Sequence, residues 1–180
     1  MTRAAIAKAT WPPRHDMLGI YLNDHLAGAT AGSELANRMT RSQRGGEEAA
    51  PLSRLAAEIA QDRSALLDIM ASLGVPVRAY KVGAAWIGEK AGRLKFNGRL
   101  RSRSPLSDLE ERELLRLGVE GKAAGWRTLR ALAATDTRLD AGRLDELISR
   151  ADSQAGLLEE LRIRAASRVI SLPGPGYTCP

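Results

Sequence analysis

Between residues 51 and 73, apolar side chains recur at alternating steps of three and four residues. This heptad spacing places them on one face of an α-helix, where they pack against a partner helix. Pro51 suits the first turn of such a helix, and Gly74 suits the position after its end. The sequence therefore predicts a helix from about Pro51 to Leu73. Its buried face consists of Leu52, Leu55, Ile59, Asp62, Leu66, Ile69 and Leu73.

Three further segments have helical spacing. The predicted helices run from about Asp16 to Arg41, from the Ser104-Pro105 start signal to about Ala134, and from about Asp140 to Val169. Aromatic residues make up only 4% of the chain, and strands favour aromatic and β-branched residues, so a sheet is not expected. The predicted seam of the last helix consists of Leu144, Leu147, Ala151, Gln154, Leu158, Leu161 and Ala165.

The segments between these helices set the domain organisation. Residues 1–13 are expected to form an extended lead-in, residues 14–170 one helical-bundle domain, and residues 171–180 a flexible tail. Within the domain, residues 75–104 form a long crossover with a short helix from about Arg78 to Lys90. The predicted fold is therefore all-α, a four-helix bundle of two helical hairpins joined by this crossover.

Positive charge is concentrated in the crossover. The chain carries a net charge of +6, and the stretch from Val75 to Pro105 has eight basic residues against one acidic residue, Glu89. Around Asn97-Gly98, basic and apolar residues alternate, which fits either a β-hairpin or a helix end. The crossover is either a solvated loop facing acidic patches or a binding site for an anionic ligand or nucleic acid. The candidate residues for such a site are Arg93, Lys95, Phe96, Arg99, Arg101 and Arg103.

Several classes of protein are disfavoured. The single cysteine, Cys179, forms no disulfide within one chain and no cysteine-based metal site. No stretch has the length of a signal peptide's apolar region or of a membrane span, so a cytoplasmic protein without membrane contact is expected. The glycines of the crossover lack the strand–loop–helix context of a phosphate loop. No Ser–His–acid arrangement is indicated, so the sequence favours a protein that is not an enzyme.

Polar residues interrupt the apolar face near the middle of each predicted helix. They are His25, Asp62, Lys122 and Gln154. Since the midpoints of antiparallel helices lie at one height, these side chains are expected to meet in one core layer. Buried charge needs a partner, so three interpretations stand: a paired layer that fixes helix register, helices rotated so that some of these residues face water, or a ligand or catalytic site.

The helix layout of residues 16–169 resembles that of the ferritin-like superfamily. That resemblance implies a di-iron site with Glu-x-x-His on two helices. Here Glu58-Ile-Ala-Gln61 has glutamine in place of the histidine. An incomplete metal set, His25, Glu58, Asp62 and Glu120, remains, and Lys122 at the same height would oppose a cation. The resemblance therefore favours a ferritin-like fold without its iron chemistry.

The leading expectation is a non-enzymatic bundle that acts through binding or assembly, as a homo-oligomer and without a cofactor. The first alternative is a degenerate metalloprotein or small enzyme built on the polar layer. The second is an anion or nucleic-acid binder that uses the crossover.

Overall fold

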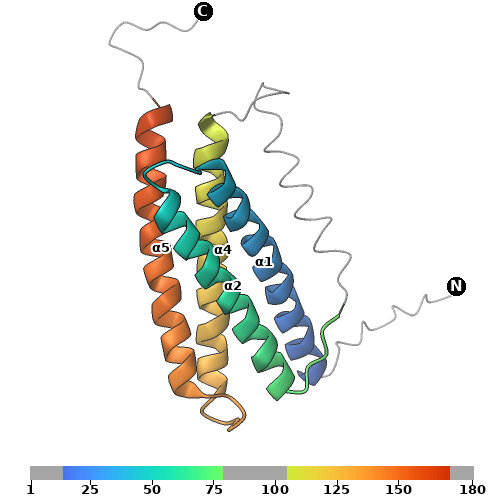
Figure 1. Cartoon of the computed structure of the whole chain (residues 1–180). Helices are drawn as coiled ribbons and strands as arrows, with labels where there is room; N and C mark the ends of the chain where they lie inside the picture. The colour runs from blue at the N-terminus through green and yellow to red at the C-terminus, as the bar shows by residue number, and fades with distance from the viewer. Residues whose placement is uncertain (1–13, 79–104, 171–180) are drawn as a thin grey trace, which may run out of the picture.

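A computed structural model describes residues 14–78 and 105–170, and these residues form four α-helices (Figure 1). Helix α1 spans Arg14–Ser42, α2 spans Ala49–Ser72, α4 spans Pro105–Leu132 and α5 spans Ala141–Val169. All four begin and end within about two residues of the predicted bounds. None of these four helices has an apolar stretch long enough to cross a membrane.

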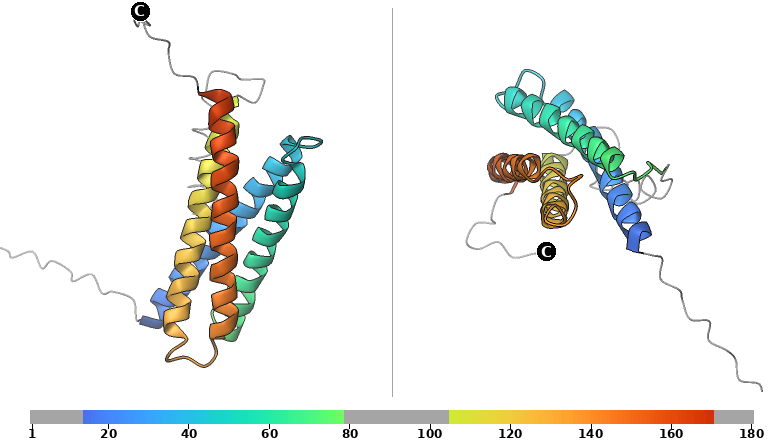
Figure 2. Two further views of the ribbon diagram at one scale, coloured as in Figure 1. Left: turned by 90° about the vertical axis from the view of Figure 1, so that its left-hand side faces the viewer. Right: turned by 90° about the horizontal axis from the view of Figure 1, so that it is seen from below.

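The helices pack as two hairpins. α1 lies along α2, α4 lies along α5, and α1 also contacts α4. Figure 1 shows that α2 ends at one end of the bundle and that α4 begins at the other. Figure 2 shows the two hairpins crossing at an angle. These observations confirm the prediction of an all-α protein with four helices in two hairpins.

Several predictions lie outside the described residues. They are the lead-in at 1–13, residues 79–90 of the helix predicted from Arg78 to Lys90, the choice between hairpin and helix end at 93–101, and the tail at 171–180.

The predicted seams form the core. The seven buried residues of α5 are those of its predicted seam, and all seven predicted positions of α2 are buried. On α4, the apolar residues that face the core include Leu115, Val119 and Leu129, which are buried. Leu117 is also apolar but is 66% exposed. It lies two residues, and therefore about 200°, around the helix from Leu115 and from Val119.

The helix ends are fixed by local hydrogen bonds. Gly74 has a positive φ of 70° and follows the end of α2, as its predicted role requires. At α5, the side chain of Asp140 caps the helix by accepting a hydrogen bond from the backbone N–H of Arg143 at 3.1 Å. Buried Asn23 accepts from the N–H of Arg78 at 2.7 Å and donates to the carbonyl of Pro76 at 3.1 Å, so the chain leaving α2 is attached to α1.

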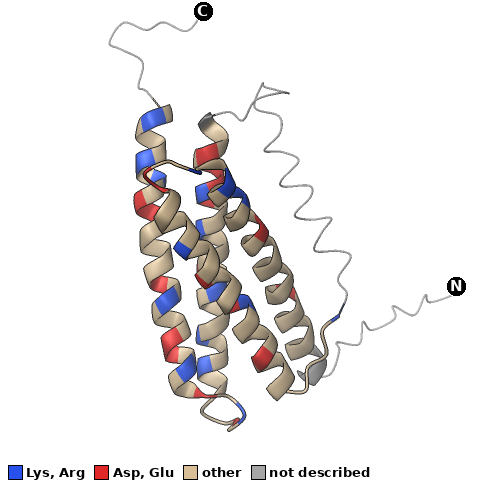
Figure 3. Ribbon diagram, viewed as in Figure 1, with Lys and Arg blue, Asp and Glu red and all other residues tan. Residues whose placement is uncertain are grey.

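A charged cluster joins the two hairpins where α4 begins and α5 ends (Figure 3). Arg112 of α4 is completely buried, and its guanidinium lies 2.6 Å from Oε2 of Glu48, at the start of α2. The same guanidinium pairs with the side chain of Asp108 and donates to its backbone carbonyl at 2.7 Å. Arg168 of α5 adds a 3.2 Å ion pair to Glu48. These four residues are called the Arg112 cluster below.

Candidate functional site

Three of the four residues predicted for the polar layer meet at mid-height. The ammonium of Lys122 on α4 lies 2.5 Å from Oδ2 of Asp62 on α2, and it also donates to the amide oxygen of Gln154 on α5. The amide nitrogen of Gln154 donates to Oδ2 of Asp62 and to Oε2 of Glu58, both at 3.1 Å. Asp62 is 1% exposed and Gln154 is 2% exposed. The structure therefore places a paired polar layer in the dry interior.

Arg150 is a further member of this layer that the sequence reading missed. Its guanidinium lies 2.5 Å from Oδ1 of Asp62, as an ion pair without hydrogen-bond alignment. The sequence does indicate this position, because Arg150 precedes Gln154 by four residues and therefore lies on the same side of α5. With Arg150 included, two cations face two carboxylates, those of Asp62 and Glu58, and the layer has no net charge.

Burial changes the basicity of Lys122. Removal of the ammonium from water lowers the pKa of Lys122 below its ordinary value of 10.5, and the charge of Asp62 opposes this shift without cancelling it. The buried carboxylate therefore holds an ammonium that is less basic than that of an exposed lysine.

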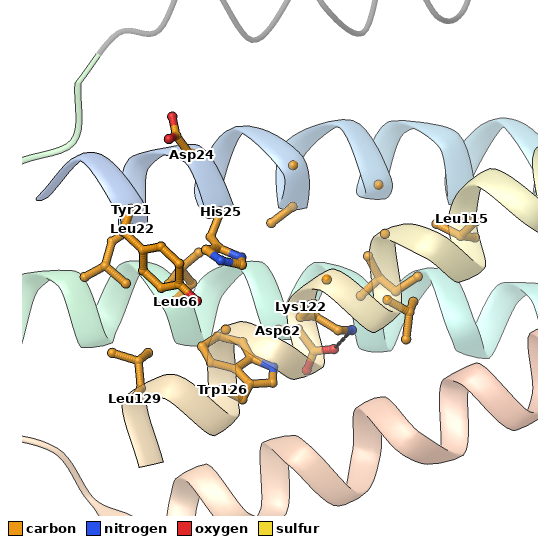
Figure 4. A pocket seen from close by; sticks show the side chains of 18 residues that line it. Tyr21, Leu22, Asp24, His25, Asp62, Leu66, Leu115, Lys122, Trp126 and Leu129 are labelled. Carbon is orange, nitrogen blue, oxygen red and sulfur yellow. Dashed lines mark hydrogen bonds and ion pairs between the residues drawn. The ribbon is translucent and has the colours of Figure 1, made fainter. Parts of the chain in front are cut away.

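A pocket of about 430 Å³ lies between α1, α2 and α4, with the polar layer in one of its walls (Figure 4). Asp62 and Lys122 line it, and His25 lies across from them on α1. The rest of the lining is mainly apolar or aromatic. It includes Leu22, Ile59, Leu66, Leu115, Val119, Trp126 and Leu129.

Glycines of two helices keep this pocket open. Gly118, Gly121 and Gly125 of α4 are spaced by three and four residues and so lie on one side of that helix. A Cβ atom added to Gly118, Gly121 or, on α1, Gly28 would meet no atom of residues 14–78 and 105–170 within 4 Å. The space at Gly125 is filled by the imidazole of His25 at 3.0 Å, and an added Cβ at Gly32 of α1 would meet Leu115 at 3.9 Å. Clustered helix glycines allow either a close helix contact or room for a bulky group, and at Gly28 the described residues leave room.

His25 lies apart from the other predicted members of the layer because the pocket separates α1 from them. Its ring packs edge-on against Tyr21, with the ring centroids 4.4 Å apart, and it lies against Gly125. Within residues 14–78 and 105–170, the imidazole makes no hydrogen bond to Asp62, Lys122 or Gln154. Burial lowers the pKa of His25 from its ordinary 6.5, and the nearby charge of Asp24 opposes this shift more weakly. The ring is therefore neutral at pH 7.

This pKa shift predicts a loss of stability in mild acid. Below about pH 6.5, the unfolded chain binds a proton at His25 that the folded protein does not bind, so the free energy of unfolding decreases as the pH falls through this range. Replacing His25→Gln removes the titration. Urea denaturation at pH 7 and at pH 5 should show a smaller decrease for the variant than for the wild type. Equal decreases would show that His25 titrates alike in both states.

The four residues proposed as an incomplete metal set are not brought together. In the described part of the chain, no group of three or more histidine, cysteine or acidic side chains is placed to hold a metal ion. Glu120 pairs with Arg116 at 3.6 Å, on the surface of α4. Asp62 is paired with Lys122, whose ammonium takes the position beside the carboxylate that a cation would need.

The six candidate residues of the basic crossover, Arg93 to Arg103, lie outside the described residues. Binding of an anion or a nucleic acid there stays a prediction.

Comparison with protein-family models, with curated proteins and with solved structures finds no match to this chain.

Proposed function

We propose that this protein is a non-enzymatic binding protein that holds a small, largely apolar molecule between α1, α2 and α4. The observation that carries the proposal is the open space beside Gly28, Gly118 and Gly121 within a pocket of about 430 Å³. These three glycines are exposed, so the pocket opens to water on this side and its apolar lining stays in contact with solvent. A bound apolar molecule would remove that lining from water.

The size and lining of the pocket support this function. Sites for small molecules are concave, mostly apolar, and have volumes of roughly 300–1,000 Å³ with a few placed polar groups. Here leucine, isoleucine and valine side chains supply the apolar wall, and Asp62, Lys122 and His25 are the placed polar groups.

The pairing within the polar layer supports binding rather than catalysis. A general base or a nucleophile needs a free position from which to reach the substrate. Lys122 instead contacts Asp62 and Gln154 at once, and Asp62 also contacts Arg150. These contacts stabilise the charges of the wall and hold its shape.

Filling the pocket with a side chain should abolish binding without harming the fold. Gly118→Leu places a leucine in open space, and leucine has a higher helix propensity than glycine by up to about 1 kcal/mol. We expect the wild type to enhance the fluorescence of N-phenyl-1-naphthylamine with a micromolar Kd. Gly118→Leu should weaken this binding by at least about tenfold, with helicity by circular dichroism unchanged.

Gly156→Leu is the matched control. Gly156 is a helix glycine of α5, and an added Cβ there would likewise meet no described atom within 4 Å, but Gly156 does not line the pocket. This variant should bind the dye like the wild type. Absence of binding by the wild type, or equal binding by the Gly118 and Gly156 variants, would refute the proposed function.

We also propose that the helix layout is ferritin-like. The support is the order of two helical hairpins joined by one long connection, which is the ferritin-like arrangement. The layer of Asp62, Lys122, Arg150 and Gln154 stands at mid-height, where di-iron proteins of that class carry their ligands.

A further inference from the structure

We infer that the molecule held in this pocket is neutral, has a flat apolar body, and carries an oxygen that accepts a hydrogen bond from Nε1–H of Trp126. This inference rests on the proposed function and adds the chemical class of the ligand. Aryl ketones and related ring compounds with a single carbonyl belong to this class.

Trp126 supplies the hydrogen-bond donor. The residue is 3% exposed and lines the pocket, and its buried indole Nε1 has no hydrogen-bond partner among the described residues. Figure 4 shows the indole beside Asp62 and Lys122, with its nitrogen on their side of the ring. Buried indole N–H groups usually find a partner, because leaving a buried donor unpaired is unfavourable. An acceptor oxygen on the ligand would satisfy it.

The charge balance of the wall favours a neutral ligand. Each carboxylate of the polar layer already has a partner: Asp62 has Lys122 and Arg150, and Glu58 has the amide of Gln154. His25 is neutral at pH 7, since burial lowers its pKa. Asp24 also lines the pocket, but it is exposed and points away from Asp62 and Lys122 (Figure 4). A charged ligand beside the polar layer would therefore lack a free counter-charge on this wall, which is costly.

The remaining lining favours a flat body. Tyr21, His25 and Trp126 present aromatic rings to the pocket, and rings pack well against one another when offset or edge-on. The glycines of α4 add bare backbone, against which a flat ring can lie closely. A branched aliphatic molecule would use these surfaces less completely.

Three naphthalenes of similar shape test the class. 2-Acetylnaphthalene carries the acceptor oxygen, 2-isopropylnaphthalene replaces this oxygen with a methyl group, and 2-naphthoate carries a negative charge. Each is measured by displacement of N-phenyl-1-naphthylamine from the full-length protein. We expect 2-naphthoate to bind at least about tenfold more weakly than the ketone, because its charge is desolvated without a new partner.

The Trp126→Phe variant tests the hydrogen bond. It keeps an aromatic side chain and removes Nε1–H, so it should weaken binding of 2-acetylnaphthalene by roughly threefold to tenfold and leave 2-isopropylnaphthalene within about twofold. Since hydrophobicity differs between the two probes, the readout is the change in their affinity ratio between wild type and variant.

NMR of the wild type gives a measurement that does not depend on the folding of this variant. In ¹⁵N-labelled protein, the ketone should move one indole N–H resonance downfield, and the isopropyl compound should not. An unchanged affinity ratio, together with no selective indole shift, would overturn the inference. If the wild type still binds the dye in that case, the proposed function is retained. Tighter binding of 2-naphthoate than of the ketone would overturn the neutral class. Absence of dye binding would overturn both proposals.

Discussion

Arg112→Leu should lower the free energy of unfolding by about 3–5 kcal/mol, the range seen when one partner of a buried ion pair is removed. The guanidinium of Arg112 is fully buried between the carboxylates of Glu48 and Asp108. Without it, these carboxylates keep only the half-exposed Arg168 as a partner within the cluster. Urea denaturation followed by circular dichroism measures the loss.

Arg164→Leu is the control for this change. Arg164 of α5 is 60% exposed and lies 3.9 Å from Glu160, in a surface pair of the kind that contributes little. Its replacement should change the free energy of unfolding by less than about 0.5 kcal/mol. A similar, small effect for Arg112→Leu would show that the Arg112 cluster does not hold the hairpins together.

Asp62→Leu should lower the free energy of unfolding by about 3 kcal/mol. Asp62 is the carboxylate shared by Lys122 and Arg150, so its loss leaves the ammonium of Lys122, which is 14% exposed, without its ion-pair partner. The matched control on the same helix is Asp68→Leu. Asp68 is 60% exposed and pairs with Arg143 at 2.9 Å, so a change below about 1 kcal/mol is expected there.

The double variant Asp62→Leu/Lys122→Met separates two roles of the pair. Replacing a buried ion pair with apolar residues of similar volume is often neutral. We therefore expect urea denaturation to place the double variant within about 1 kcal/mol of the wild type, since Arg150 is one-third exposed and can turn toward water. Equal losses in the single and double variants would show that Asp62 does not stabilise the fold through Lys122.

The helices and their buried faces could be predicted because the spacing of apolar residues within each helix identifies the side that packs against its neighbours. On α5 the predicted seam and the buried residues coincide, and Gly74 ends α2 where its conformational freedom indicated. The same periodicity placed Asp62, Lys122 and Gln154 toward the core. The apolar stripe of a helix shows which side faces the core. Since Asp62, Lys122 and Gln154 lie on that side near the middle of their helices, they meet at one height.

The pocket could not be predicted, because it depends on how far apart the helices lie. The spacing of His25 fits a core position whether α1 packs tightly or leaves a gap, and no single-helix pattern distinguishes these cases. Arg112 could have been found, however. It lies three residues before Leu115 on the seam of α4, as Lys122 lies three residues after Val119, and the same reasoning applies to both.

The Arg112 cluster and the Asp62 layer both connect the first hairpin to the second, and they do so at different heights. Glu48 and Asp62 are about four helical turns apart along α2. One such attachment would allow the hairpins to pivot about it, whereas two fix both their relative rotation and their axial alignment. A slip of one turn would move Arg112 away from Glu48 and Lys122 away from Asp62 at the same time, so a misaligned bundle would lose both attachments together.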